Sequence, residues 1–523
     1  MPTEETNIQT AVAKLIKAGF QISPETLDML QKEQNPNQIV DTFLSSNKIH
    51  PLETPVLKPT HFQLPQIEPP EIAEKKETEP TKPITRLTSK RQPAESIKSE
   101  IKILKDPTPE LQGKGTIDDF LLNFQDRYYR LRDIISQRVD GKGIIDIKDA
   151  MKAKKNTTND KERTVKIVGQ VTKKTTTKSG NIAIELDDLT GRVTVIVQQR
   201  DPNLISKAKL VLLDQVLCIE GAPISSEMLI AKDLFLPDIP SNRRNNRAKE
   251  DISALLISDI HYGSQHFLDK IFQKVLDWLQ GKEGSKEHIE LAGNVKYIII
   301  NGDLVDGIGI YPNQLDEITI HDLDSQFQGL NRLLQEIPNH IHVLITPGNH
   351  DGVRLALPRP AIDEQFLSAL NESGTEVTSL GCPSQVSLHG VNVLIYHGDS
   401  LVDIMAALSK PELEARFVAM REMLRGRHLA PIYGKKKDDR IGTTLAPEPR
   451  DWLVIDEVPD ILHCGHVHVT SVGSYRKTLL INSGTFQSQT NYQKLIGIEP
   501  TPGIIPLVNL QTLNVKTLNF IQS

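Results

Sequence analysis

Cysteine is scarce in this sequence, and its scarcity limits what can hold the fold together. The 523 residues include only three cysteines, Cys218, Cys382 and Cys464. They lie far apart and in no Cys-x-x-Cys spacing, which argues against both a disulfide framework and a zinc ribbon. Each of the three is expected to be a small buried residue.

Long apolar runs are also missing. No stretch approaches the roughly 20 apolar residues that a membrane-spanning helix needs. The start, MPTEETNIQTAVAKLIK, lacks a basic segment followed by an apolar one, which a secretion signal would have. The sequence therefore predicts no membrane partner and a cytoplasmic location.

Positive charge is not in excess, because the formal net charge at pH 7 is -6. A surface devoted to nucleic acid would usually be basic, so any contact with DNA has to come from local patches. The chain is also too long for one hydrophobic core, and several domains are expected.

The amino-terminal part of the chain changes composition abruptly. Residues 1–50 place apolar side chains at helical spacing, which predicts a small helical interaction module. Residues 51–112 mix proline with charge and contain few aromatics, so a disordered linker is expected there. Residues 115–160 then predict a helix and a connector. One apolar stripe along this helix would dock against a neighbour, and it consists of Phe120, Phe124, Tyr128 and Leu131.

Five short alternating segments fill residues 163–240: VKIVGQV, NIAIELDD, GRVTVIVQ, QVLCIEGAPI and MLIAKDLFL. Strands of this number and length are typical of an oligonucleotide-binding (OB) type β-barrel. They carry almost no aromatic side chains on which bases would stack. Packing against a neighbouring domain is therefore at least as good an interpretation as direct DNA binding.

From residue 250 to residue 523, near-continuous apolar strands alternate with helical segments, which predicts an α/β sheet buried on both faces. Ligands of such sheets sit beyond the carboxyl ends of the strands. Polar clusters follow five of the predicted strands, namely Asp259-Ile260-His261, Asn301-Gly302-Asp303, Asn349-His350-Asp351, His397 and His466-Val467-His468. In the first cluster, alternation along an extended segment would aim Asp259 and His261 to the same side.

These clusters combine carboxylates, an amide and several imidazoles, and they contain no cysteine. That mixture suits Mn²⁺, Fe²⁺ or Zn²⁺, whereas Mg²⁺ and Ca²⁺ prefer oxygen ligands alone. Two such cations about 4 Å apart can bind the oxygens of a phosphate and generate hydroxide near neutral pH. The clusters therefore predict hydrolysis of a phosphate ester with two divalent cations, of which Mn²⁺ is preferred.

In this order the clusters resemble the DxH, GDxxD, GNHD, H and GHxH motifs of the calcineurin-like metallophosphoesterases. The resemblance implies a sandwich of sheets flanked by helices, with Asp303 bridging the two cations. It also implies the other ligands, which are Asp259, His261 and His468 for the first cation and Asn349, His397 and His466 for the second.

The same resemblance implies roles beside the ligands. His350 is similar to the family's histidine that donates a proton to the leaving oxygen. Asp351 is expected to orient His350 through a carboxylate contact, with a simple turn cap as the alternative. For Asp306, three residues after the bridge, a structural role is favoured over a direct one.

An OB-type barrel directly before such a domain, with a helical module and a proline-rich linker ahead, resembles the small subunits of archaeal family-D DNA polymerases. The matching pieces include GDLVDGIGIYPNQ (302–314), GNHDGVRLALPRP (348–360) and RGRHLAPIYG (425–434). The related B subunits of eukaryotic replicative polymerases have lost the ligands, which are all present here. The resemblance implies a 3′→5′ exonuclease that proofreads DNA 3′ ends at the nucleoid, in a heterodimer with a large catalytic polymerase subunit.

A basic run lies between His397 and the last motif, within residues 411–440. Such a run could hold the phosphates of a single strand. The candidate substrate contacts are Arg425, Arg427, His428, Lys435 and Lys436. A packed histidine is the alternative for His428.

Two rival functions stay open on the sequence alone. One is a non-catalytic scaffold that only holds a polymerase subunit, and the other is a general phosphomonoesterase. The partner of residues 1–50 is open as well, with a sliding clamp, a primase and the large subunit all conceivable.

Overall fold

This computed structural model describes residues 93–152, 164–408, 412–433 and 443–521, together with a few positions among the first 92 residues. The chain divides into two compact units, Met1–Leu87 and Thr88–Ser523. In the first unit, β1 (Gln21–Ile22) pairs in parallel with β2 (Val56–Leu57). Most of the expected helical module and of the expected linker lies outside the described residues. Within the described part, no helix is both long and apolar enough to cross a membrane.

Two six-stranded sheets form the larger part of the second unit. The strands of the first are β10 (Ser253–Ile257), β11 (Val295–Asn301), β12 (His342–Thr346), β13 (Val377–Ser379), β19 (Ile504–Asn509) and β20 (Val515–Asn519). Those of the second are β3 (Ile101–Lys105), β14 (Ser384–Leu388), β15 (Val391–Ile395), β16 (Ile461–Cys464), β17 (Ser471–Tyr475) and β18 (Thr478–Asn482). The first sheet runs in the order β13-β12-β11-β10-β19-β20, and the second in the order β17-β18-β16-β15-β14-β3.

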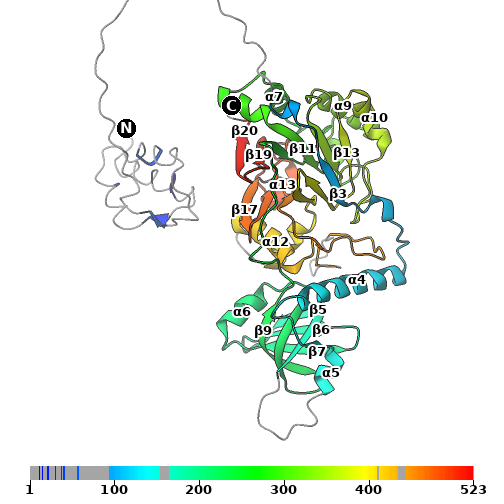
Figure 1. Ribbon diagram of the computed structural model, residues 1–523, viewed down its shortest axis with the longest axis vertical. Coiled ribbons are helices and arrows are strands. Elements are labelled where there is room, and N and C mark those ends of the chain that lie inside the picture. The colour runs from blue at the N-terminus through cyan, green and yellow to red at the C-terminus, as the bar shows by residue number, and fades with distance from the viewer. Residues whose placement is uncertain are drawn as a thin grey trace, which may run out of the picture. The chain divides into compact units, whose positions relative to one another are not determined.

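Helices cover the outer faces of both sheets (Figure 1). On the first sheet they are α7 (Asp269–Leu279), α8 (Lys286–Gly293), α9 (Leu323–Leu334) and α10 (Glu364–Glu372). On the second sheet they are α11 (Ser400–Leu408) and α12 (Glu412–Gly426). Short elements η5 (Gln314–Asp316) and α13 (Asn491–Ile496) lie in the connections.

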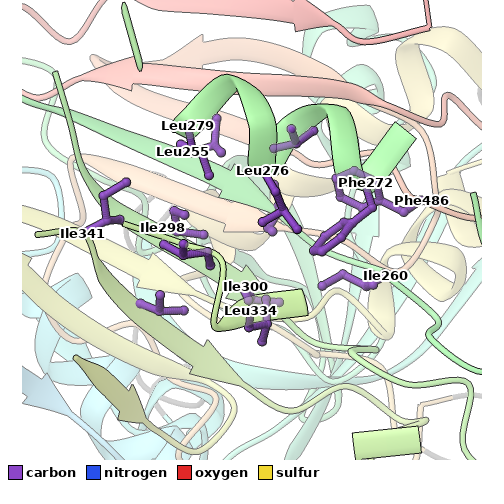
Figure 2. Packing of buried hydrophobic residues seen from close by; sticks show 14 of the residues in the cluster. Leu255, Ile260, Phe272, Leu276, Leu279, Ile298, Ile300, Leu334, Ile341 and Phe486 are labelled. Atoms are coloured by element: carbon purple, nitrogen blue, oxygen red, sulfur yellow. The ribbon is translucent and has the colours of Figure 1, made fainter. Parts of the chain in front are cut away.

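Successive side chains along a strand point to opposite faces of its sheet, and this alternation forms the layers of the sandwich. Leu255 and Ile298 of the first sheet pack against its helices, while their neighbours Leu256 and Ile299 pack against the second sheet. Figure 2 shows the helix-side cluster, where Phe272 of α7 lies beside Phe486, with strand residues such as Leu255 and Ile298 in the same cluster. The result is an α/β sandwich of two sheets between two helical layers.

The structured region begins earlier than the sequence predicted. The expected linker extended to residue 112, but η2 (Pro93–Ser96), β3 and η3 (Thr108–Glu110) precede that point. Strand β3 pairs antiparallel with β14 at the edge of the second sheet. An extended segment satisfies its backbone hydrogen-bonding groups when it pairs with an edge strand. The proline-rich composition around β3 gives no sign of such pairing.

The five predicted barrel strands are all present. They are β5 (Val165–Thr176), β6 (Ile182–Asp187), β7 (Arg192–Val197), β8 (Val216–Pro223) and β9 (Met228–Phe235). They follow the order β5-β6-β7-β9-β8, and a pairing between β5 and β8 closes the barrel. Helix α6 (Pro202–Lys209) connects β7 to β8. Alternate apolar side chains, such as Ile184 and Val195, fill the interior.

Helix α4 (Ile117–Ser136) joins the barrel to the two-sheet sandwich (Figure 1). Tyr128 and Leu131, from the predicted stripe, are buried against β5 and β8. Arg127, on the same helix, forms a buried ion pair with Asp451 of the sandwich at 2.6 Å. The connector then supplies β4 (Ile144–Ile145), which extends the barrel sheet, and α5 (Ile147–Lys152).

The expectation for the cysteines is confirmed. All three cysteines are unpaired and buried. The carboxyl-terminal segment forms β19 and β20, which extend the first sheet beyond β10.

Candidate metal centre

The polar clusters predicted from the sequence meet at one edge of the sandwich. They follow β10, β11 and β12, which are parallel neighbours in the first sheet, and β15 and β16, which are parallel neighbours in the second. Parallel strands end at the same edge, so the residues that follow them share one site.

The backbone turns sharply at these positions. Left-handed φ angles from 51° to 68° occur at Asp259, His261, Asp303, His466 and His468. This conformation is costly for residues other than glycine and concentrates at functional sites. Asp259 and His261 do face one common site, as expected, but two left-handed residues rather than an extended strand place them there.

Asp259, His261 and His468 form a first compact group of possible ligands. The Nε2 of His468 lies 3.3 Å from Oδ1 of Asp259 and 3.0 Å from Nε2 of His261. All three residues are buried. Two imidazole nitrogens that face each other this closely need a proton or a cation between them, so the group can hold one metal ion.

Asp303, His397 and His466 form a second group. The Nε2 of His397 lies 3.1 Å from Oδ2 of Asp303 and 3.2 Å from Nδ1 of His466. The same Oδ2 is 3.8 Å from Nε2 of His261, which belongs to the first group. One carboxylate oxygen thus faces both groups, which is the position that a bridging ligand needs.

The surroundings of the two groups fit a pair of cations. The Oδ1 of Asn349 is buried and has no hydrogen-bond partner among the described residues. Such an amide oxygen is costly unless something else binds it. Gly348 leaves space beside the Asp303 carboxylate, because a Cβ there would lie 2.1 Å from Oδ1 of Asp303. An orphaned oxygen beside carboxylates and imidazoles matches the donors that borderline divalent cations prefer.

Asp306 lies beside the first group and contacts His261. Its Oδ1 lies 3.0 Å from Nδ1 of His261. Its carboxylate also accepts hydrogen bonds from Gln314 at 3.0 Å and from Gln487 at 3.1 Å. A third close group, His261 with Asp306 and His350, is also present. Because the Asp306 carboxylate already has these three partners, we assign it the orientation of His261 rather than the binding of an ion.

Two further groups contact the histidines from outside, a side chain and a backbone carbonyl, and the sequence did not predict either contact. The side-chain amide of Gln493 lies 2.8 Å from Nδ1 of His468, and the carbonyl oxygen of Asn301 accepts from Nδ1 of His397 at 3.0 Å. Such contacts select the ring nitrogen that faces a cation. Gln493 belongs to a helix beyond the last motif, and only the folded chain returns it to the site.

His350 stands beside the ligands. Its ring centroid lies 4.7 Å from that of His261. Its Nδ1 lies 2.6 Å from the carbonyl oxygen of Asp306, which can only accept, so Nδ1 carries the hydrogen. The Nε2 lies 4.0 Å from Oδ2 of Asp303, at the edge of the two groups. His350 can therefore exchange a proton at Nε2 without being a ligand.

The structure corrects the role expected for Asp351. Its Oδ1 accepts from the backbone N–H of Leu304 at 2.7 Å, and its Oδ2 accepts from that of Gly348 at 2.8 Å. His350 instead contacts the Asp306 carbonyl. Asp351 is thus the turn cap that the sequence left as the alternative, because the buried backbone N–H groups of Leu304, Val305 and Gly348 need an acceptor.

Charge is unevenly distributed over the site. Burial would raise the pKa of Asp303, but the facing imidazoles, with His397 first, hold that pKa well below its usual range. Burial would likewise lower the pKa of His397, but Asp303 raises it to about 10. Burial lowers the pKa of His466 to about 4, so this ring is neutral and its nitrogen is available to a metal.

The expected substrate contacts at Arg427 and His428 are wrong. Arg427 is buried and donates from Nε to the carbonyl oxygen of Ile455 at 2.7 Å. His428 is also buried, with Nε2 2.9 Å from Oδ2 of Asp451, and burial lowers its pKa to about 4. Both side chains are buried and bind residues more than 20 positions away in the sequence. They are therefore not exposed to a DNA phosphate.

The remaining members of the basic run differ from each other. Arg425 pairs with the buried carboxylate of Glu422 at 2.8 Å, so much of its charge is already neutralised. Lys435 and Lys436 lie outside the described residues. For these two lysines the expected contact with a strand stays a prediction.

The chain is similar to known proteins of DNA replication. Residues 254–472, which include every candidate ligand, match the family of the B subunits of DNA polymerases alpha and epsilon. A DNA polymerase II small subunit of Methanothermobacter thermautotrophicus is 39% identical over 410 residues, which cover 78% of this chain and 81% of the relative. A DNA polymerase II small subunit of Archaeoglobus fulgidus is 38% identical over 403 residues, or 77% of each chain.

One solved structure is a distant match. It is described as a novel archaeal phosphodiesterase, and the match covers 51% of this chain and 99% of that one at 13% identity. Its TM-score of 0.26 is too low for an inference about fold.

Proposed function

Because this chain belongs to the family of archaeal DNA polymerase II small subunits, and is thus an accessory subunit of a DNA polymerase, we propose that it is also the proofreading enzyme of that polymerase. In this proposal it is a metal-dependent 3′→5′ exonuclease that removes nucleotides from DNA 3′ ends. Polymerase activity belongs to the complex with a large catalytic subunit. The site of action is the cytoplasm, at the nucleoid.

The convergence of two donor groups on Asp303 carries this proposal. Asp303 would bridge the cations, and the other ligands would be Asp259, His261 and His468 for one ion and Asn349, His397 and His466 for the other. When bound, two divalent ions, with Mn²⁺ preferred and Fe²⁺ or Zn²⁺ as alternatives, polarise the phosphate and activate a water molecule. A scaffold subunit would need neither the orphaned amide oxygen nor the five left-handed residues.

The chain's own residues supply the proton for the leaving group. Hydrolysis of the last phosphodiester adds water to phosphorus and breaks the bond to the 3′ oxygen of the preceding nucleotide. That oxygen needs a proton, and Nε2 of protonated His350 is the group placed to give it, since Nδ1 is held by the Asp306 carbonyl. The products are a nucleoside 5′-monophosphate and a shortened strand with a 3′ hydroxyl.

The proposal also names the domains. We assign residues 163–240 to an OB-type barrel, which the order β5-β6-β7-β9-β8 and the helix between β7 and β8 support. We assign residues 250–523 to a calcineurin-like phosphoesterase domain, which the helix-flanked sheet sandwich supports. Binding of a sliding clamp or a primase by residues 1–50 stays a prediction from the sequence.

The direct test is degradation of 3′-labelled single-stranded DNA with Mn²⁺, by the chain alone and by the complex with its large subunit. We expect stepwise shortening by the native chain, and a loss of at least roughly 100-fold in Asp303→Ala and His350→Ala. His288→Ala, at an exposed histidine of α8, is the matched control and keeps full activity. Equal shortening by native and Asp303→Ala proteins would point to a contaminating nuclease and reject the proposal.

Two measurements separate the rival functions. Elemental analysis should find about two transition-metal ions per chain, whereas a scaffold that has no catalytic site would hold none. Nitrophenyl phosphate should be a poorer substrate than a DNA strand. Faster turnover of the monoester would favour the phosphomonoesterase instead.

A further inference from the structure

A line of aromatic rings leads from the first group of ligands to the surface. The rings of His261 and His350 are 4.7 Å apart, those of His350 and Tyr311 6.2 Å, and those of Tyr311 and Tyr492 6.5 Å. The line starts at His261, which is 2% exposed, and ends at Tyr492, which is 56% exposed. The histidine placed to protonate the leaving group is thus linked through ring contacts to an open tyrosine.

Tyr311 and Tyr492 are held as a pair. Their ring planes differ by only 25°. Glu317 connects the two segments, because its Oε2 accepts from the Tyr311 hydroxyl at 3.3 Å and its Oε1 accepts from the side chain of Asn491 at 2.9 Å. The nearly parallel rings therefore have a fixed mutual arrangement, and a planar group lying on Tyr492 would continue their stack.

Helix α13 ties the outer ring to the metal centre. A capping box between Thr490 and Gln493 opens this helix. Gln493 is buried beside His468, while the adjacent Tyr492 is exposed. The same short helix therefore orients a possible ligand on one side and presents an aromatic ring on the other.

Apolar side chains close to Tyr311 and Tyr492 in the sequence are also exposed. Ile308 and Leu315, in the loop that carries Tyr311, are 41% and 57% exposed, and Leu495 of α13 is 85% exposed. All three lie within four residues of Tyr311 or Tyr492 in the sequence, so both segments present apolar groups to solvent. In contrast, Tyr297 and Tyr396 of the sandwich are completely buried.

We propose that Tyr311 and Tyr492 form a stacking platform for the terminal nucleobase of an unpaired DNA 3′ end. This inference rests on the proposed exonuclease function and names how its substrate is held. Every base has a flat face that stacks on an aromatic ring, so the platform accepts any base. A paired base is already stacked inside the duplex, so moving it to the platform costs energy that a frayed or mismatched end does not require. The platform would therefore favour the ends that need editing.

The test combines variants with a change in the substrate. Tyr492→Ala and Tyr311→Leu are compared with native protein in the complex with the large subunit. The DNA single strands end either in a normal nucleotide or in an abasic one. Tyr492→Phe keeps the ring, and Tyr129→Ala removes a tyrosine on α4 that is 50% exposed and serves as the matched control.

We expect Tyr492→Ala and Tyr311→Leu to raise KM for the normal end on the order of tenfold, with kcat changed far less. On the abasic end both variants should match the native protein, because there is no base to stack. Tyr492→Phe, which keeps the ring, should recover most of the affinity that Tyr492→Ala loses on the normal end, and Tyr129→Ala should behave as native on both ends. Metal content per chain, measured on every variant, shows that the centre is intact.

The outcomes separate the two proposals. If the native complex shortens DNA but both variants equal it on the normal end, the platform is rejected and the exonuclease stands. If the native complex does not shorten DNA at all, the exonuclease is rejected, and equilibrium binding of the same two strands decides the platform. The platform is supported if the native complex binds the normal end more tightly than the abasic end and Tyr492→Ala loses this preference. The platform is overturned if Tyr492→Ala keeps the preference unchanged.

Discussion

The Nδ1 of His261 lies 3.0 Å from Oδ1 of Asp306, so a buried carboxylate fixes the ring whose other nitrogen faces the first group of ligands. Burial would raise the pKa of Asp306, but the hydrogen bond with His261 keeps that pKa low and the side chain charged. An outer carboxylate of this kind makes the imidazole a better metal ligand and holds its orientation.

Asp306→Asn should therefore weaken the binding of one Mn²⁺ ion by about 10- to 100-fold without removing a ligand. Titration of the metal-free chain with Mn²⁺, followed by electron paramagnetic resonance, would separate a weak site from a strong one. Asp316→Asn, at an exposed aspartate of η5, is the matched control. Two equally strong sites in Asp306→Asn would contradict the assignment.

Gly348 offers a second prediction. A Cβ at this position would lie 2.1 Å from Oδ1 and 2.5 Å from the backbone nitrogen of Asp303. Oδ1 accepts from the backbone N–H of His350 at 2.9 Å, so neither atom can easily move away. Gly348→Ala should displace the Asp303 carboxylate, abolish DNA shortening and lower the metal content, with a loss of about 1–3 kcal/mol in stability from overpacking.

Gly191→Ala is the control for this substitution, because the nearest atom to its new Cβ would be 3.8 Å away. It should change neither DNA shortening nor metal content. Both quantities are measured on the two variants side by side. Retention of two metal ions in Gly348→Ala would refute the role of Gly348.

The sequence predicts the site well where its information is local. Each candidate ligand follows an apolar strand within a few residues, as Asp259 follows β10 and Asp303 follows β11. Apolar runs and the polar residues that end them are visible without knowing the fold. Because neighbouring strands run parallel, their carboxyl ends lie at one edge of the sheet, and this brings the polar residues together.

Contacts between distant segments are what the sequence does not reveal. His428 resembles a phosphate-binding residue because it stands among arginines, but Asp451 and burial determine its role. Gln493 reaches His468, and Tyr492 reaches Tyr311, only through the position of α13. A run of charged residues in the sequence does not show whether their side chains are exposed. Burial and ion pairing depend on residues that are distant in the sequence.

The buried pair of Arg127 and Asp451 gives a prediction about stability. Their side chains are 1% and 2% exposed, and Asp451 is shared with His428. Asp451→Ala would leave the Arg127 charge buried and unpaired, which should lower the free energy of unfolding by about 3–5 kcal/mol. Removing the more exposed pair through Asp187→Ala, whose partner Arg192 is 64% exposed, should cost far less, because solvent screens this pair.

Urea unfolding of the two variants, followed by tryptophan fluorescence, measures this difference. The double variant Arg127→Met, Asp451→Leu removes both charges and should recover part of the loss. Equal stability of Asp451→Ala and Asp187→Ala would show that the buried pair does not hold α4 to the sandwich.

Lys105 at the end of β3 predicts a dependence of stability on pH. Its side chain is buried and Nζ donates to the carbonyl oxygen of Val454 at 2.8 Å. Burial lowers its pKa from 10.5 to about 7, although Asp456 opposes the change. Between these values the unfolded chain binds the proton and the folded chain does not, so raising the pH shifts the balance toward the folded state. Below pH 7 both states are protonated, and the cost of burying the charge is constant.

Unfolding of native protein and of Lys105→Met at several values from about pH 6 to pH 10 measures this contribution as a difference. The stability of the native protein relative to Lys105→Met should rise above about pH 7, by at most roughly tenfold in the unfolding equilibrium constant per pH unit, and should be flat below it. Lys102→Met, at an exposed lysine on the same strand, should give curves parallel to those of the native protein. Parallel curves for Lys105→Met as well would mean that Lys105 keeps its proton in the fold, and that its charge is solvated or paired at the edge of the second sheet.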